Sequence, residues 1–479
     1  MPFTFHPCRW KCWAPVLPAF MLLLCLGGCA TYSAKFADLR PQVAEGRFDA
    51  ALETVEKESG SHDRLLYHLE RGLILHFAGR FPASNTEFHT AERLADELYT
   101  KSISQGAISL FTNDNAIDYR ARPFEMAMVP YYKALNYLYL GEPEEAQVEA
   151  RRASELLSRY VDATLKGVRE GDGDRLHQVR NNAFLLYYSG MLYDSEGEVN
   201  DAFIAYRNAA AAFQKNHGLL NIQIPPELGE DLERVGRRLG FESELVELRK
   251  QCPDVLQGDE EGIWPPGQGE VVLLLETGFV AQKTQTRFDF PVFKDSAYDD
   301  EDYWAWEIYG GMGNMHAFTR GHKVEYWVSV AAPELQDAPG PIGGARVSAG
   351  LSGDKVRTSR TANLNREARI TFDAEKPSIF FKTIARGLTK YLATRSLGKE
   401  SKVAGALANI FGAVTETADT RSWLTLPENV HLARLTLPPG VHELTVEVLD
   451  REGHPVVTRT IGGVEVKAGQ WTFVNQRVF

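Results

Sequence analysis

A helix–turn–helix pattern that returns several times between residues 39 and 213 constrains the fold of this 479-residue chain more than any other feature. In each copy a small residue lets two helices cross closely, a glycine ends the first helix, and alanines face the next pair. Such pairs cannot bury their apolar faces singly, so we expect them to stack. The full copies use Gly72, Gly79, Phe81, Phe88 and Ala91, then Ala134, Tyr137, Gly141, Ala146, Ala150 and Ala153, then Gly190, Tyr193, Gly197, Ala202, Tyr206 and Ala209, and a partial copy uses Gly46, Phe48, Ala51 and Val55.

This spacing resembles the tetratricopeptide repeat, which implies an α-solenoid with a concave face. Six apolar and aromatic residues stand at positions that line this face in that family: Tyr131, Leu135, Leu138, Phe184, Tyr187 and Met191. These six residues have two interpretations. In the first, they line an open groove that binds an extended or helical peptide of a partner. In the second, they are core residues covered by inserted segments or by the C-terminal domain. Aromatic residues at helical spacing are more often packed than free, which favours the second interpretation.

The first residues predict a secretory signal. Arg9 and Lys11 precede an apolar run, Trp13 to Leu26, that is too short to cross a bilayer. Leu26-Gly27-Gly28-Cys29 follows and resembles a bacterial lipobox, which implies that Cys29 becomes the first mature residue and carries lipid. A plain signal peptide with an incidental cysteine is the alternative. Ala30 stands where an aspartate would retain such a lipoprotein at the inner membrane, so the resemblance implies an outer-membrane anchor and a body that faces the periplasm.

Cysteine and charge content fit this address. Of the five cysteines, only Cys252 is neither in the signal nor the expected lipid acceptor, so the mature chain is expected to have no internal disulfide. The net charge is −12, and loss of residues 1–28 makes it −14, with 50 basic against 64 acidic residues. An acidic body argues against nucleic acid as a partner, because a phosphate backbone requires a basic surface.

A change of period divides the rest of the chain. The pattern stays helical to about residue 256, a polar, Pro/Gly-rich stretch follows, and short strands with alternating side chains begin near Val271. We therefore predict an α + β multidomain chain with a TPR-like α-solenoid followed by a β-sandwich-like domain of immunoglobulin-like type. The boundaries are a signal peptide at 1–28, a lipid-anchored tether at 29–36, the helical repeat domain at 37–258, a linker at 259–268 and the β-rich domain at 269–479.

Two departures interrupt the expected strands. Residues 295–318 are acidic and aromatic, and Trp304 and Trp306 could stack on sugar rings, although a surface loop is the simpler interpretation. A helical insertion at about 377–417 has an apolar stripe (Phe381, Ile384, Leu388, Tyr391 and Leu392), a basic row (Lys382, Arg386 and Lys390) and an uncharged stretch, 403–414. The insertion either folds back on the sheet as a hairpin, which is favoured, or touches a membrane or another copy.

The sequence contains no zinc-protease, nucleophile-elbow, paired-cysteine or phosphate-loop motif. Asp419 and Arg421 are best explained as a structural ion pair beside Trp423 that fixes the helical insertion to the sheet. A catalytic role for this pair needs a third partner, and no nearby histidine or cysteine supplies one. We therefore expect no catalytic residues, no metal and no cofactor.

Taken together, the lipobox, the repeats, the strand 269–276, the helix with Arg386 and Lys390, and the stretches 419–427 and 439–442 resemble an uncharacterised family of bacterial tetratricopeptide-containing lipoproteins. The resemblance spans nearly the whole chain and brings no activity. The expected function is a non-enzymatic, outer-membrane-anchored periplasmic scaffold that binds protein partners of the envelope machinery. The alternative is glycan or peptidoglycan binding by the β-domain.

Overall fold

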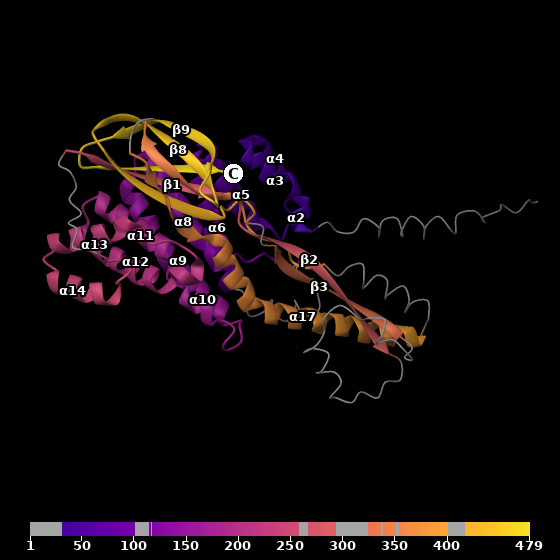
Figure 1. The fold of residues 1–479 in the computed structure, drawn as a ribbon. Helices are drawn as coiled ribbons and strands as arrows, with labels where there is room; N and C mark the ends of the chain where they lie inside the picture. The colour runs from indigo at the N-terminus through magenta and orange to yellow at the C-terminus, as the bar shows by residue number, and fades with distance from the viewer. Residues whose placement is uncertain are drawn as a thin grey trace, which may run out of the picture.

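Helices come first along the chain and sheets come second, so the expected α + β class is confirmed (Figure 1). The structure is a computed structural model, and it describes residues 31–100, 115, 117–257, 267–293, 324–336, 339–350, 354–400 and 417–479. The expected signal peptide with Cys29, the acidic and aromatic loop with Trp304 and Trp306, and the uncharged stretch 403–414 lie outside the described residues.

The N-terminal helices form antiparallel pairs that follow one another in space as they do in the chain. In the pairs α5/α6, α8/α9 and α11/α12 the two helices pack together, and α6 contacts α8, α9 contacts α11, and α12 contacts α13. The helices are α2 (Tyr32–Lys35), α3 (Leu39–Ala44), α4 (Phe48–Glu58), α5 (Arg64–Phe77), α6 (Phe81–Thr100), α8 (Pro123–Leu140), α9 (Pro143–Leu165), α10 (Asp174–Gln178), α11 (Ala183–Ser195), α12 (Val199–Leu220), α13 (Pro226–Arg238) and α14 (Glu242–Gln251).

Glycines set the geometry of these pairs in the two ways that the repeat frame predicts. Gly141 ends α8 in a left-handed conformation with φ of 76°, and its N–H bonds the carbonyl oxygen of Leu138. Gly190 lies against the ring of Tyr206, so close that a Cβ atom built on it would be 2.4 Å from a ring carbon. A side chain at this position would therefore push the two helices apart.

Two four-stranded sheets share a buried core. The first sheet has the order β10-β1-β7-β6, and β1 runs parallel to β10 and antiparallel to β7. The second sheet has the order β5-β4-β8-β9. The strands are β1 (Gly269–Thr277), β4 (Ile342–Ala349), β5 (Val356–Arg357), β6 (Ser359–Asn363), β7 (Asn429–Leu437), β8 (Gly440–Asp450), β9 (Pro455–Val466) and β10 (Trp471–Val478).

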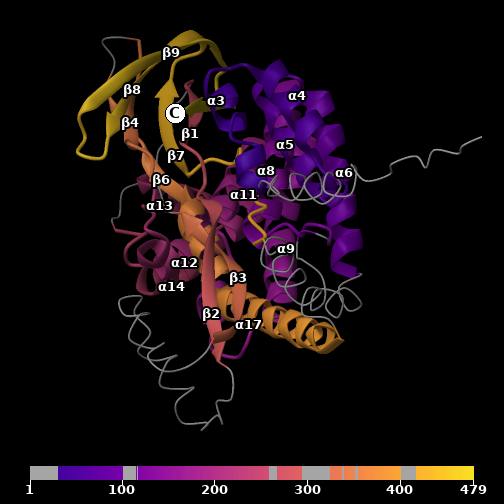
Figure 2. The same cartoon turned by 90° about the vertical axis from the view of Figure 1, so that its right-hand side faces the viewer.

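Strand β1 is buried on both faces, which explains why it reads as a continuous apolar run rather than an alternating one. Val271, Leu273 and Leu275 join the core between the two sheets. Val272 and Leu274 point the other way and join the core formed with the helices. The first sheet is thus the middle layer, with helices on one side and the second sheet on the other (Figure 2).

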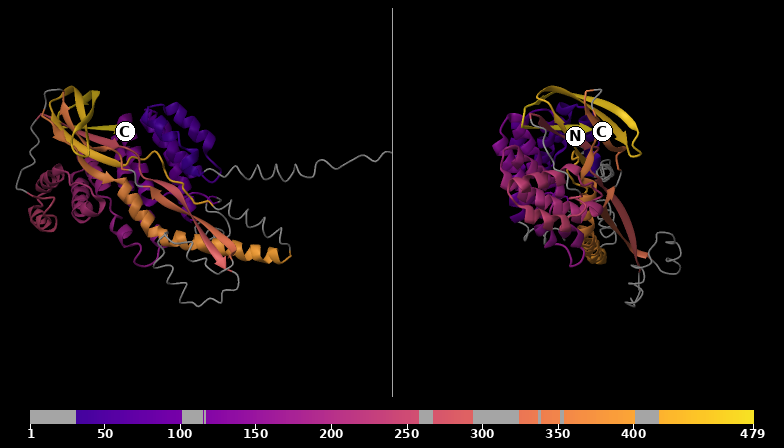
Figure 3. Two further views of the ribbon diagram at one scale, coloured as in Figure 1. Left: turned by 45° about the vertical axis from the view of Figure 1, so that its right-hand side comes forward. Right: turned by 60° about the vertical axis from the view of Figure 1, so that its left-hand side comes forward.

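An arm extends from these layers (Figures 1 and 3). It consists of the antiparallel hairpin β2 (Gln282–Phe293) and β3 (Val324–Gln336) together with α17 (Leu364–Glu400), which packs along β3. The side-chain oxygen of Asn363 accepts a bond from the Arg366 N–H at 3.1 Å and caps the start of α17.

The predicted start of the helical insertion, at about residue 377, is wrong. The helix begins at Leu364, because the Asn363 cap starts it well before the apolar stripe. In the described residues it runs out along β2 and β3, and the rest of the predicted insertion, 401–416, lies outside the described residues.

The close approach of Gly190 and Tyr206 generates a stability prediction. Gly190→Ala should lower the free energy of unfolding by about 1–3 kcal/mol, because the added methyl overlaps a buried ring. The matched control is Gly218→Ala in α12, where no atom lies within 4 Å of the added Cβ. This change should raise stability by about 0.5–1 kcal/mol through helix propensity. Thermal denaturation measures both, and equal effects would contradict the close crossing.

Candidate functional site: a groove closed by the chain itself

The residues expected to line a partner groove are buried. Tyr131, Leu135, Phe184, Tyr187 and Met191 are each at most 1% exposed, and Leu138 is partly buried against the same core. The structure therefore corrects the open-groove interpretation. The first sheet and residues 417–428, which we call the closing segment, cover this face of the helices.

Helix carboxylates bind the backbone of the closing segment. Glu125 of α8 accepts the N–H of Trp423 at 2.9 Å. Glu70 of α5 accepts the N–H groups of Leu424 and Thr425 at 2.6 and 3.3 Å, and also the Thr425 hydroxyl. These are charge-assisted bonds of the kind that a groove offers to an extended peptide. The groove thus holds a peptide, and the peptide is part of the same chain.

Cations on other elements bind the carbonyl groups of the same segment. Arg40 of α3 donates to the Leu424 oxygen at 2.9 Å. Lys283 of β2 donates to the Arg421 oxygen at 3.0 Å, and burial lowers the pKa of Lys283 to about 8. Donors and acceptors along the segment are therefore matched by side chains from both the helices and the arm.

Trp423 is the apolar anchor of the closing segment. It is completely buried, and its ring lies 6.0 Å from that of Phe88 and 6.5 Å from that of Tyr132, measured between centroids. Its indole N–H donates to the Thr425 hydroxyl at 3.2 Å, so the polar edge of the ring is also paired.

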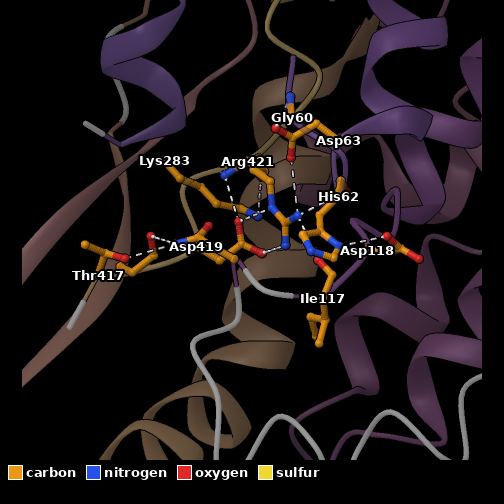
Figure 4. Close-up of polar contacts among 11 residues, drawn as sticks. Gly60, His62, Asp63, Ile117, Asp118, Lys283, Thr417, Asp419 and Arg421 are labelled. Atoms are coloured by element: carbon orange, nitrogen blue, oxygen red, sulfur yellow. Dashed lines mark hydrogen bonds and ion pairs between the residues drawn. The ribbon is translucent and has the colours of Figure 1, made fainter. Parts of the chain in front are cut away.

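Asp419 and Arg421 form the expected ion pair, with Nε to Oδ1 at 2.9 Å (Figure 4). Arg421 also reaches Asp63 at 3.3 Å and donates to the backbone oxygens of His62 and Ile117 at 3.2 and 2.9 Å. Although burial disfavours its charged form, the pKa of Asp419 is lowered by the Arg421 guanidinium. The role of the pair differs from the expected one, because it fixes the closing segment to the N-terminal helices.

A second set of buried charges joins the first sheet to the helices. Glu276 of β1 accepts the hydroxyl groups of Tyr131 and Tyr132 at 3.2 and 2.9 Å. The guanidinium of Arg434 on β7 lies between Asp231 of α13 and Glu270 of β1, and it also donates to the Tyr187 hydroxyl at 3.3 Å. Two of the expected groove residues, Tyr131 and Tyr187, thus have their hydroxyls engaged by the sheet.

The contacts of Glu70, Glu125, Glu276 and Arg434 were not predicted from the sequence. Each of the last three stands as a lone charge within an apolar stretch, as in Phe124-Glu125-Met126 and Ala433-Arg434-Leu435. A lone charge within a buried element requires a partner. This signal marks an internal contact, although it does not identify the partner.

A cleft of about 590 Å³ opens where β10 meets the first helices, and His76, Tyr139, Arg459 and Arg477 are among its lining residues. His76 is paired with Asn136 at 2.7 Å and with Asn475 at 3.2 Å. Arg477 donates to the backbone oxygen of Gly278 at 2.8 Å and lies over the ring of Phe479. His76 and Arg477 are therefore held by internal contacts.

Within the described residues, no group of three or more His, Cys, Asp or Glu side chains is placed to hold a metal ion. None of the helices in the described part of the chain is long and apolar enough to cross a bilayer. Cys252 is a buried thiol whose pKa is raised by burial.

Loss of Arg421 should weaken the attachment of the closing segment to the helices. Arg421→Met leaves Asp419 and Asp63 without their cation, and we expect a loss of about 3–5 kcal/mol in the free energy of unfolding. Arg80→Met is the control, because Arg80 pairs with Asp49 at 2.8 Å at the surface. This change should alter stability by no more than about 0.5 kcal/mol in chemical denaturation. Similar effects of the two substitutions would show that the Arg421 cluster is not structural.

The stability contributed by Glu367 of α17 should fall as pH rises. Burial raises its pKa to about 7, from 4.5, although the Asn182 amide, which donates to Glu367 at 2.9 Å, lowers it in part. Because the folded state binds the proton more tightly, this contribution is fully present below pH 4.5 and is lost as pH rises through 7.

Glu367→Gln mimics the protonated form. Relative to the parent chain, the free energy of unfolding of this variant should increase by up to about 3 kcal/mol between about pH 5 and about pH 8. Denaturant titrations over this range measure the difference. A difference that stays constant with pH would contradict a proton on Glu367 in the folded state.

Comparison with known proteins gives no family for this architecture: no protein-family model matches the chain, and no characterised protein matches its sequence.

Proposed function

We propose that this chain is a non-enzymatic scaffold of the bacterial cell envelope, anchored to the outer membrane by lipid on Cys29 and facing the periplasm. The lipobox-like sequence 26–29 and the apolar run before it support the anchor. The partners in this proposal are proteins of the envelope machinery, bound at the surface of a rigid body.

The helical layer of this scaffold is a TPR-like solenoid. Three observations support this assignment: the helix pairs stack in chain order, glycines such as Gly79, Gly141 and Gly197 follow the first helices with positive φ, and Gly72 and Gly190 lie against the rings of Phe88 and Tyr206. The two sheets form its β-sandwich-like partner layer.

The observation that carries the proposal is the closed groove. The closing segment, β1 and β7 place buried charged contacts across the face that a solenoid of this kind offers to peptides. The helices, the sheets and the base of the arm are thereby joined into one body. Such a body offers outer surfaces at fixed positions, which is what a scaffold requires.

The outer helices carry exposed apolar side chains that suit such contacts. Val148 on α9, Ile204 on α12 and Val246 on α14 are all exposed. They lie on helices of the same stack, on faces turned away from its core. We propose that a protein partner binds this outer helical surface.

Photo-crosslinking in cells tests the proposal. A photoreactive residue in place of Ile204 or Val246 should give a discrete adduct with one partner of the envelope. The matched control is Val441 on β8, which is equally apolar and more exposed but belongs to the second sheet. It should give no such adduct.

The same experiment is repeated with Cys29→Ser. Acyl labelling should disappear, the chain should leave the membrane fraction, and the adduct should weaken because the partner and the chain no longer share a surface. Adducts of equal strength from all three positions, or from none, would contradict the scaffold. Persistent membrane association of the Cys29→Ser chain would contradict the anchor.

A further inference from the structure

The outer half of α17 carries a row of exposed apolar side chains. Phe381, Leu388 and Leu392 are 61%, 43% and 62% exposed. Their spacing of seven and eleven residues places them on one face of the helix, two and three turns apart. The row spans about 16 Å along the axis. Helices of a soluble body rarely leave such a row in water without a use for it.

The same half of the helix is strongly basic. Residues 376–399 contain six Lys or Arg residues and no Asp or Glu: Lys376, Lys382, Arg386, Lys390, Arg395 and Lys399. Arg386 is buried, so at most the other five basic residues are available to a ligand. The chain as a whole has a net charge of −12. Positive charge is therefore concentrated on the outer half of α17, while the remainder of the protein is acidic.

The arm and the start of the described chain lie close together. Helix α2 contacts β2, and the arm extends away from the layered body on this side (Figures 1 and 3). Cys29 is two residues before Thr31, so a lipid anchor there would hold Thr31, at the start of α2, within about 10 Å of a bilayer.

We propose that α17 docks on an anionic lipid surface through Phe381, Leu388 and Leu392. An interfacial helix has this composition, with aromatic and leucine side chains on one face and lysine and arginine on the others. Negative lipid headgroups attract the basic residues, while the acyl boundary accepts the apolar row. The inference rests on the proposed function only in the expectation that a membrane is nearby.

Charge selects a lipid surface over a second copy of the chain. Two arms packed through the same row would bring together two segments with five Lys or Arg residues each besides the buried Arg386, and like charges at such separations oppose association. An anionic bilayer neutralises these charges and buries the row at the same time. The acidic remainder of the protein would be repelled from the same surface, which orients the body away from it.

Vesicle co-sedimentation tests the proposal with the chain from Ala30 onward, which keeps every described residue and has no acylated cysteine. It should bind vesicles of phosphatidylglycerol and phosphatidylcholine, bind more weakly as salt increases, and not bind phosphatidylcholine alone. Leu388→Glu with Leu392→Glu should abolish binding. Lys376→Glu with Lys382→Glu should weaken it at least about fivefold for each residue changed.

Val148→Glu with Val246→Glu is the matched control, because these residues are 50% and 49% exposed on helices outside the arm. This pair should leave vesicle binding unchanged, and thermal denaturation should show all three double variants folded. Binding that survives Leu388→Glu with Leu392→Glu, or that is equal on neutral vesicles, overturns the proposal. So does light scattering that shows a dimer dispersed by the same pair. The chain from Ala30 onward lacks Cys29, so the result does not depend on whether Cys29 carries lipid.

Discussion

Buried carboxylates between the helices and the first sheet hold these two layers in one arrangement. A buried carboxylate needs hydrogen-bond donors, and leaving it without them destabilises the fold by several kcal/mol. Glu70 and Glu125 find donors in the backbone of the closing segment, and Glu276 finds them in two tyrosine hydroxyls of α8. Since donor and acceptor come from different layers, neither layer satisfies its polar groups alone.

Because each layer needs polar partners from the other, the inner face of the stacked helices binds the closing segment. Burial raises the pKa of Glu70 to about 7, even though the Thr425 hydroxyl and the N–H of Leu424 both stabilise its charged form. A carboxylate in this position is suited to one partner whose donors are fixed in place. The closing segment supplies these donors from the same chain, so no association entropy is lost when it binds. A separate peptide would have to replace all of these contacts together.

Local features of the fold were predictable from the sequence because their causes are local. The spacing of Gly190 and Tyr206 predicts a close crossing of the two helices within one pair. The continuous apolar sequence of β1 indicates that this strand is buried on both faces. The start of β1 at Gly269 coincides with the expected boundary of the β-rich domain. The ion pair of Asp419 and Arg421 involves residues two positions apart, so its two members could be named in advance.

Contacts across the layers were not predictable, because their causes are remote. Trp423 and Glu125 are 298 residues apart, and Leu424 and Glu70 are 354 residues apart. A single sequence shows that each charge needs a partner and does not show which one. The early start of α17 was missed for a different reason. Residues 364–376 mix charged and apolar types without a clear stripe, and the Asn363 cap was the signal that marked the helix.

The parallel pairing of β1 with β10 has a consequence for biogenesis. Strand β10 follows all other described strands in the chain, yet it lies beside the first one, and Asn475 on it donates to Glu276 at 3.0 Å. A ribosome or an export channel releases the helices long before it releases this strand. Until then the cover over their aromatic face is incomplete, and nascent proteins with exposed apolar surface aggregate or recruit chaperones. Maturation should therefore be a late, nearly simultaneous event rather than a stepwise one.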